Sequence, residues 1–139
     1  MKAVSTIFEY VLLFMFGIII FISSVGVFRG YETYFNSVSA NDQLAEVSEY
    51  VSSNVIKLAE MGAGEESFIT VTVPKKIGGS EEYMIELSSG GLNATSMTTR
   101  ISKHSDLYNL SRTFSLSGKV VSKAGSVIIY KTGNQIIIS

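Results

Sequence analysis

The hydrophobic pattern changes twice along the chain, and each of its three parts predicts a different structure. Residues 10–28, with the sequence YVLLFMFGIIIFISSVGVF, form an apolar run that contains no formal charge. A hydrocarbon core roughly 30 Å thick requires about 20 helical residues to cross it, and a single span in lipid must be helical to satisfy its backbone hydrogen bonds. The run therefore predicts a membrane-spanning α-helix.

Helical periodicity continues beyond the apolar run as an amphipathic pattern. Apolar residues recur at intervals of three and four, and most of the acidic side chains lie outside this stripe. The stripe consists of Leu44, Val47, Val51, Val55 and Leu58. Glycines at positions 62 and 64 predict the end of the helix. We expect one nearly continuous helix from about Ser5 to Met61, whose outer half packs on the rest of the chain or on helices of other copies.

From Glu66 onward the spacing at which apolar residues recur falls from about 3.6 residues to 2, which predicts β-strands. Residues 66–88 predict a hairpin with a long loop, residues 92–101 an edge or outward-facing strand, and residues 103–111 a loop. Four further short strands are expected at 113–116, 119–122, 126–131 and 135–138. This spacing predicts an antiparallel β-sandwich-like domain over 65–139, which follows a long helix over 4–62 and makes the chain α+β.

Composition and charge narrow the class of function. The 139 residues include 11 Lys and Arg against 12 Asp and Glu, for a net charge of −1. This balance gives no electrostatic argument for a nucleic-acid partner. The chain has no cysteine, which excludes disulfides and thiolate metal sites. We expect one modest domain outside the membrane, stabilised by its core, its hydrogen bonds or its neighbours.

No motif in the chain predicts an enzyme, a cofactor or a metal site. His104, the only histidine, lies in a polar stretch with no ligand at metal-binding spacing, so a solvated side chain is expected. Gly78-Gly79-Ser80 predicts a turn, because no Lys-Ser/Thr helix start follows as in a phosphate loop. The acidic pairs at 65–66 and 81–82 favour a solvated surface over a calcium site.

The residues before the apolar run carry a specific motif. Lys2-Ala3-Val4-Ser5-Thr6 resembles the N-terminus of archaeal type IV pilins and pilin-like proteins, which read basic residue, Gly or Ala, Val-Ser, Pro or Thr, and then a long apolar helix. The resemblance implies that residues 1–3 are a leader. A prepilin peptidase would cut between Ala3 and Val4, and the helix would remain on the mature protein.

The resemblance extends more loosely to two other parts of the chain. Residues 73–79 and 83–87, VPKKIGG and YMIEL, follow an order that is similar to that of the family's β domains. Pilins also carry a glutamate near the start of the helix, usually as the fifth mature residue, which pairs with a neighbouring N-terminus. Glu9 would be the sixth residue after cleavage at Ala3. It is therefore either such a contact or a carboxylate at the level of the lipid headgroups.

The resemblance implies a structural subunit of an archaeal type IV pilus-like surface filament. Its apolar helix would form the membrane anchor in lipid before assembly and the filament core among sister subunits afterwards. Small residues in the run and an aromatic residue beyond it predict the helix contacts, at Gly17, Gly26 and Phe35, beside Glu9. The alternative is a membrane-anchored, non-polymerising β module that binds an archaellum component or the cell wall.

Two Asn-x-Ser/Thr tripeptides indicate possible glycosylation, at Asn93 and Asn109. A glycan requires an exposed backbone outside the cytoplasm. Because Lys2 lies on the other side of the span, we expect a single-pass protein whose N-terminus is cytoplasmic and whose β domain is extracellular.

Overall fold

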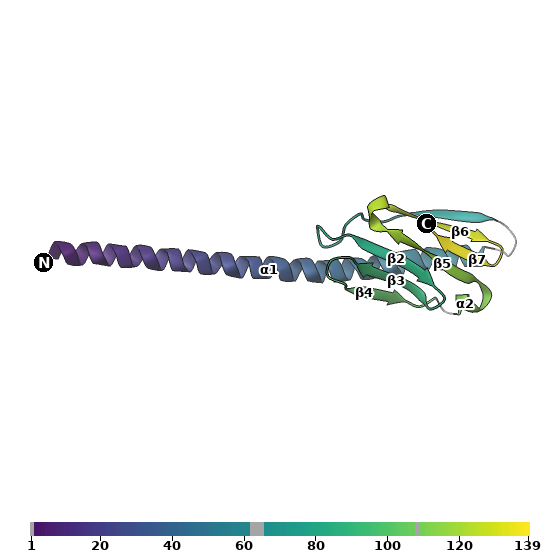
Figure 1. Ribbon diagram of the computed structural model, residues 1–139, viewed down its shortest axis with the longest axis horizontal. Helices are drawn as coiled ribbons and strands as arrows, with labels where there is room; N and C mark the ends of the chain where they lie inside the picture. The colour runs from purple at the N-terminus through teal and green to yellow at the C-terminus, as the bar shows by residue number, and fades with distance from the viewer. Residues whose placement is uncertain (1, 62–65, 108) are drawn as a thin grey trace. The chain divides into compact units, whose positions relative to one another are not determined.

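The computed structural model describes residues 2–61, 66–107 and 109–139, with side chains from Ser5 onward. The chain is α+β, as the sequence predicts: a long helix precedes a seven-stranded sheet (Figure 1). The elements are α1 (Lys2–Glu60), β1 (Ser67–Thr72), β2 (Tyr83–Ser88), β3 (Gly91–Ser96), β4 (Ser102–Ser105), α2 (Leu110–Thr113), β5 (Ser115–Val121), a 3₁₀ turn (Ser122–Ala124), β6 (Ser126–Thr132) and β7 (Gln135–Ile138).

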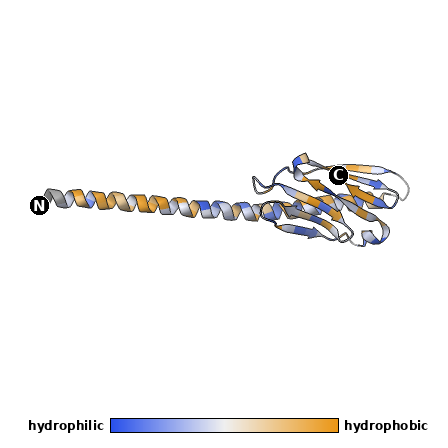
Figure 2. Cartoon of the chain, viewed as in Figure 1, coloured by the Kyte–Doolittle hydropathy of each residue, from blue (hydrophilic) through white to orange (hydrophobic). Residues whose placement is uncertain are grey.

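The chain divides into two compact units, residues 1–36 and residues 37–139. Helix α1 is a single element of 59 residues that contributes to both. Its first part is predominantly apolar and its second part is mixed (Figure 2). The predicted stop signal at residues 62–64 lies outside the described residues, although α1 ends where the sequence predicts.

The second unit is a helix packed on one sheet, which corrects the sandwich-like arrangement predicted for the strands. All seven strands belong to a single sheet in the order β1-β6-β7-β5-β2-β3-β4. Neighbouring strands are antiparallel except for β5 and β7, which are parallel. A sheet must bury its apolar face against a second layer. Here the amphipathic part of α1 provides that layer, so no second sheet is required.

The predicted helix stripe is confirmed as part of the core. All five of its residues are buried, and Ala40 extends the stripe by one turn. The strands alternate as a half-buried sheet should, with every second side chain facing α1. The buried apolar residues of the strands are Val71, Tyr83, Ile85, Leu87, Leu92, Ala94, Leu116, Val120, Val127, Ile129, Ile136 and Ile138.

The predicted hairpin over residues 66–88 is wrong. Three strands separate β1 from β2 in the sheet, and β1 pairs with β6 along its whole length, from Ser67–Lys131 to Thr72–Ser126. The connection of residues 73–82 is long enough to carry the chain across the sheet. Short-range order predicts a hairpin only when the loop is short, because a long loop does not dictate which strand is the partner.

The strands near the middle of the domain also differ from the prediction. β3 is not at an edge: it pairs with β2 on one side and with β4 on the other. The stretch 103–111, predicted as a loop, overlaps both β4 and α2. Because the β4 sequence SKHS has no apolar alternation, its pairing with β3 could not be predicted from the pattern.

Gly118 lies within a strand instead of separating two. β5 runs unbroken through the position where two strands are predicted. Gly118 has a φ of 130°, and a Cβ there would lie 2.2 Å from the carbonyl oxygen of Ile138. Only glycine therefore permits the close approach of β7 to β5 in their parallel pairing.

Two contacts identify the two ends of the second unit. Near the Ser37 end of α1, the Gly78 backbone N–H donates a hydrogen bond to Gln43 Oε1 at 3.0 Å. Near the Glu60 end, the buried Lys131 Nζ donates to the carbonyl oxygens of Ala59 and Met61. The loop that follows β1 thus lies at the Ser37 end, and the end of β6 lies at the Glu60 end.

Candidate functional site

The candidate functional surface of the first unit is the apolar exterior of α1. The helix from Ser5 to Glu60 is long and apolar enough to cross a membrane, with a mean hydropathy of 2.7 in its most apolar window. None of that window is buried inside the protein. By length and composition this helix is suited to a membrane anchor.

The apolar side chains cover the whole circumference of this part of α1. Phe14 and Phe16, which point in nearly opposite directions on a helix, are 70% and 61% exposed. A helix that is apolar on all sides is stable only when lipid or other apolar helices surround it. The surface therefore requires a non-aqueous environment in every direction.

Three of the four predicted contact residues, Gly17, Gly26 and Phe35, lie on two opposite faces of α1. Gly17 and Phe35 are 18 residues apart, which is about five turns, so they lie on one line along the helix. Gly26 lies nine residues, or about two and a half turns, beyond Gly17 and is therefore on the opposite face. A single straight neighbouring helix would therefore contact only one of the two glycines, and the predicted contacts at Gly17, Gly26 and Phe35 remain predictions.

The exposed surface of α1 has two shallow hollows that share Val27, and Gly26 lines neither of them. One is lined by Ser23 and Val27 among larger apolar residues, and the other by Val27, Gly30, Tyr31 and Tyr34. No side-chain or neighbouring atom lies within 4 Å of the position of a Cβ on Gly26 or Gly30. Small residues with free space beside them allow a second helix to approach closely.

Near the N-terminus the structure leaves the predictions as they stand. Glu9 is exposed on α1. The predicted processing site concerns Lys2, Ala3 and Val4, whose side chains lie outside the described residues.

The two possible glycosylation sites have different surroundings. Asn109 is exposed in the turn before α2, with a left-handed φ of 65°. Asn93 lies in β3, and its Oδ1 is 2.8 Å from His104 Nδ1. The other ring nitrogen of His104 is 3.0 Å from Asp106 Oδ1. Asn109 is therefore the more accessible acceptor, and His104 is hydrogen-bonded as well as solvated.

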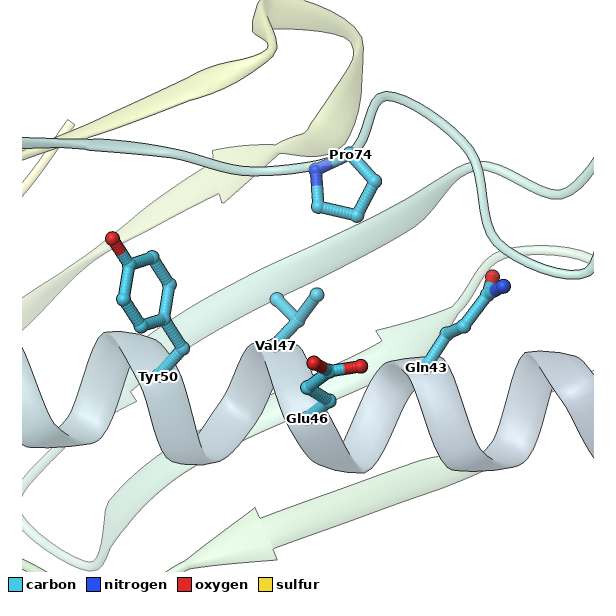
Figure 3. Close-up of a pocket in the computed structure, with 5 residues that line it drawn as sticks. All are labelled: Gln43, Glu46, Val47, Tyr50 and Pro74. Carbon is cyan, nitrogen blue, oxygen red and sulfur yellow. The ribbon is translucent and has the colours of Figure 1, made fainter.

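The second unit has a groove between α1 and the segment that follows β1. Gln43, Glu46, Val47, Tyr50 and Pro74 line it, and its volume is about 380 Å³. In Figure 3 the side chains of Tyr50, Val47 and Gln43 rise from α1 towards Pro74. Glu46 is the only carboxylate in the lining, so the groove lacks the paired titratable groups that acid–base chemistry requires.

Among the residues that the structure describes, no group of three or more His, Asp or Glu side chains could hold a metal ion. Comparison with known proteins adds no relative: no family model, no curated protein and no solved structure matches this chain.

Proposed function

We propose that this chain is a structural, non-enzymatic subunit of an archaeal type IV pilus-like surface filament. The observation that carries the proposal is the apolar surface of α1, exposed around the whole helix directly behind the motif Lys2-Ala3-Val4-Ser5-Thr6. Lipid covers this surface before assembly, and sister helices cover it afterwards. Because lipid tails are as apolar as leucine, exchanging lipid for helix contacts costs little, and packing decides the outcome.

The predicted contact residues on opposite sides of α1 support a filament over a simple helix dimer. A twofold dimer uses the same face on both subunits, whereas a heterologous contact joins one face to a different face and continues into a ring or filament. Gly26 lies on one face of α1, and Gly17 and Phe35 lie on the other. With two such faces each subunit has a neighbour on either side.

A second function, an anchored module that does not polymerise, is favoured by one observation. The stripe in the outer half of α1 is fully buried against its own sheet, so the second unit needs no sister subunit to complete its core. In this alternative the span is only an anchor. The β domain would bind an archaellum component or the cell wall.

Mass spectrometry of surface-extracted protein, combined with electron microscopy of sheared surface material, separates the two functions. For a filament subunit we expect a mature chain that begins at Val4, together with filaments. An Ala3→Phe variant should remain unprocessed, and a conservative Thr6→Ser control should be processed normally. An intact Met1 on the surface form, without filaments, would reject the filament and support the anchored module.

The same spectra test the orientation. We propose that the N-terminus is cytoplasmic and the β domain extracellular, which exposes Asn109 to glycosylation outside the cell. A glycan mass on the peptide that contains Asn109 would support this orientation. Complete protection of the β domain from protease added to intact cells would contradict it.

A further inference from the structure

The two edges of the sheet differ in how they are protected against pairing with another strand. In the described part of the chain, β1 pairs only with β6 and β4 pairs only with β3. Edge strands are usually protected by shortness, by inward-facing charges, by bulges or by proline. β4 has only four residues and carries Lys103, which pairs with the buried Ala94. β1, with the sequence SFITVT, has neither charge nor proline, so of the two edges β1 alone is open to a further strand.

The backbone of β1 directs free hydrogen-bonding groups to this edge. Residue pairs in an antiparallel ladder alternate between hydrogen-bonded and non-hydrogen-bonded. The Val73 N–H donates to the Gly125 carbonyl oxygen at 3.1 Å, so every second residue of β1, counted back from Val73, bonds to β6. The residues between them direct their N–H and C=O groups to the open edge, and these residues are Phe68, Thr70 and Thr72. Such a row of donors and acceptors is a template for another extended strand.

Apolar side chains lie beside the open edge, on the face of the sheet that points away from α1. Phe68 is 69% exposed, and its ring lies 6.3 Å from that of Tyr130, centroid to centroid. Ile137, which pairs with Tyr130, is also exposed and continues this row. Exposed apolar residues beside an open edge are typical of an interaction surface. A strand added to β1 would cover Phe68, because cross-strand neighbours on one face are in contact.

The occupant that fits this edge is β1 of a second copy. Because each copy has one open and one protected edge, pairing β1 with β1 uses both open edges. The joined sheet then ends in a protected β4 on either side, so the assembly closes as a dimer. A foreign strand would instead present a new open edge of its own.

The charges beside β1 favour antiparallel pairing of the two copies. The exposed Glu66 precedes the strand and the exposed Lys75 follows it. Antiparallel strands bring the Glu66 end of each copy beside the Lys75 end of the other. Parallel strands would instead place like charges together, which is unfavourable. An antiparallel pair also has the twofold symmetry that is commonest among dimers.

We propose that two copies join through antiparallel pairing of β1 with β1, around a twofold axis at Thr70. This register places Thr70 opposite Thr70 and Phe68 opposite Thr72, so every free backbone group of β1 gains a partner. On the other face, Ile69 lies opposite Val71. The contact thus joins aromatic and β-branched side chains and pairs no like charges. It uses only residues of the second unit, and it does not rest on the proposed function.

Single engineered cysteines test the contact, because the chain has no cysteine of its own. The full chain is purified in detergent micelles as Thr70→Cys, as Thr72→Cys and as Ser102→Cys, and is then oxidised. A cysteine on the twofold axis lies about 5.5 Å, Cα to Cα, from the same residue of the other copy, which is within disulfide range. The two Thr72→Cys positions are four residues apart along the strands, so that their Cα atoms are about 14 Å apart.

We expect covalent dimers from Thr70→Cys, without larger species. We expect no dimers from Thr72→Cys, or from Ser102→Cys on the protected β4. This pattern distinguishes the edge contact from association through the apolar part of α1, which would not select one position on β1. Absence of dimers from Thr70→Cys, or equal yields from the three variants, would overturn the proposal.

Amide hydrogen exchange of the cysteine-free chain provides an independent measurement with a matched control. In the dimer, the N–H groups of Phe68, Thr70 and Thr72 should exchange about tenfold or more slowly than in Thr70→Lys, which places two like charges on the axis. Ser117→Lys, exposed on the central β5, should keep the slow exchange. Circular dichroism should show that both variants remain folded. Fast exchange at these positions in the unmodified chain, or slow exchange that survives Thr70→Lys, would overturn the proposal.

Discussion

Tyr83 shows how one residue fastens the loop after β1 to the sheet. Its side chain is buried, and its hydroxyl donates a hydrogen bond to the carbonyl oxygen of Pro74 at 2.6 Å. Its backbone N–H donates to Ser122 Oγ at 3.1 Å, and that hydroxyl donates to the carbonyl oxygen of Lys75 at 2.8 Å. Through its hydroxyl and its backbone N–H, Tyr83 thus joins β2 to the loop after β1 and to the 3₁₀ turn.

The burial of Tyr83 makes the stability of the domain depend on pH in the alkaline range. Burial raises the pKa of Tyr83 from 10.0 to about 12. The unfolded chain therefore loses this proton first. The raised pKa of Tyr83 adds about 2–3 kcal/mol to the free energy of unfolding. This stabilisation is fully present below pH 10 and is lost as the pH rises towards 12.

Chemical denaturation of the wild type and of Tyr83→Phe, at several pH values between 9 and 12, measures this effect. The variant should lack this part of the pH dependence, although it should be less stable at pH 7 because it loses the hydrogen bond to Pro74. If the free energy of unfolding falls equally steeply with pH in the two proteins, Tyr83 is not the cause of the loss of stability at alkaline pH. Tyr130→Phe, at an exposed position on β6, is the matched control.

At the scale of the element, Lys131 fixes the C-terminal end of α1 to β6. A buried lysine is unusual, but here its charge lies at the negative end of the helix dipole and donates to two terminal carbonyl groups. The ring of Phe114 also lies under the ammonium, 5.5 Å from Nζ to the centroid. The residue thus replaces the usual helix cap by a contact from a distant strand.

Lys131→Met preserves most of the apolar volume and removes the donor. We expect a loss of about 2 kcal/mol in the free energy of unfolding, because the terminal carbonyl groups lose a charged donor. The exposed Lys119→Met on β5 should change the stability by less than about 0.5 kcal/mol. Urea denaturation of both variants measures the difference. Equal stabilities would mean that water caps the helix as well as Lys131 does.

At the scale of the whole molecule, the two units use α1 for different purposes. In residues 37–60 its apolar stripe completes the core of the chain's own domain, whereas in residues 5–36 its apolar surface has no cover within the protein. Substitutions in the two parts should therefore affect different properties, stability in one and assembly in the other.

Val51→Glu and Phe35→Glu test this division. Val51 is 0% exposed, so an unpaired carboxylate there should cost several kcal/mol and lower the melting temperature. Phe35 is 64% exposed, so Phe35→Glu should leave the melting temperature unchanged and abolish filaments. Tyr50→Glu, at the exposed position next to Val51, is the control for an added charge. Filaments from Phe35→Glu would count against the proposed assembly.

The local pattern was sufficient to predict the long helix, the residues of its buried stripe, the change to strands near Glu66 and the final hairpin of β6 and β7. These features depend on side chains close together in the sequence, and the periods of 3.6 and 2 state directly which face of an element is apolar. The apolar stripe from Leu44 to Leu58 therefore identified the buried face of the helix, although not the layer that covers it, and the alternation in β6 identified the buried face of that strand. The surface that we propose as the membrane anchor could also be predicted, because one uninterrupted apolar run forms it.

Tertiary structure alone decided the order of the strands, and with it the edges of the sheet. β1 pairs with β6 and not with β2, β4 forms from a stretch without apolar alternation, and Gly118 permits a parallel contact where a break was predicted. Each of these depends on contacts between residues far apart in the chain, which no short pattern encodes. The same holds for Lys131, whose role as a helix cap exists only because β6 ends beside the last turn of α1.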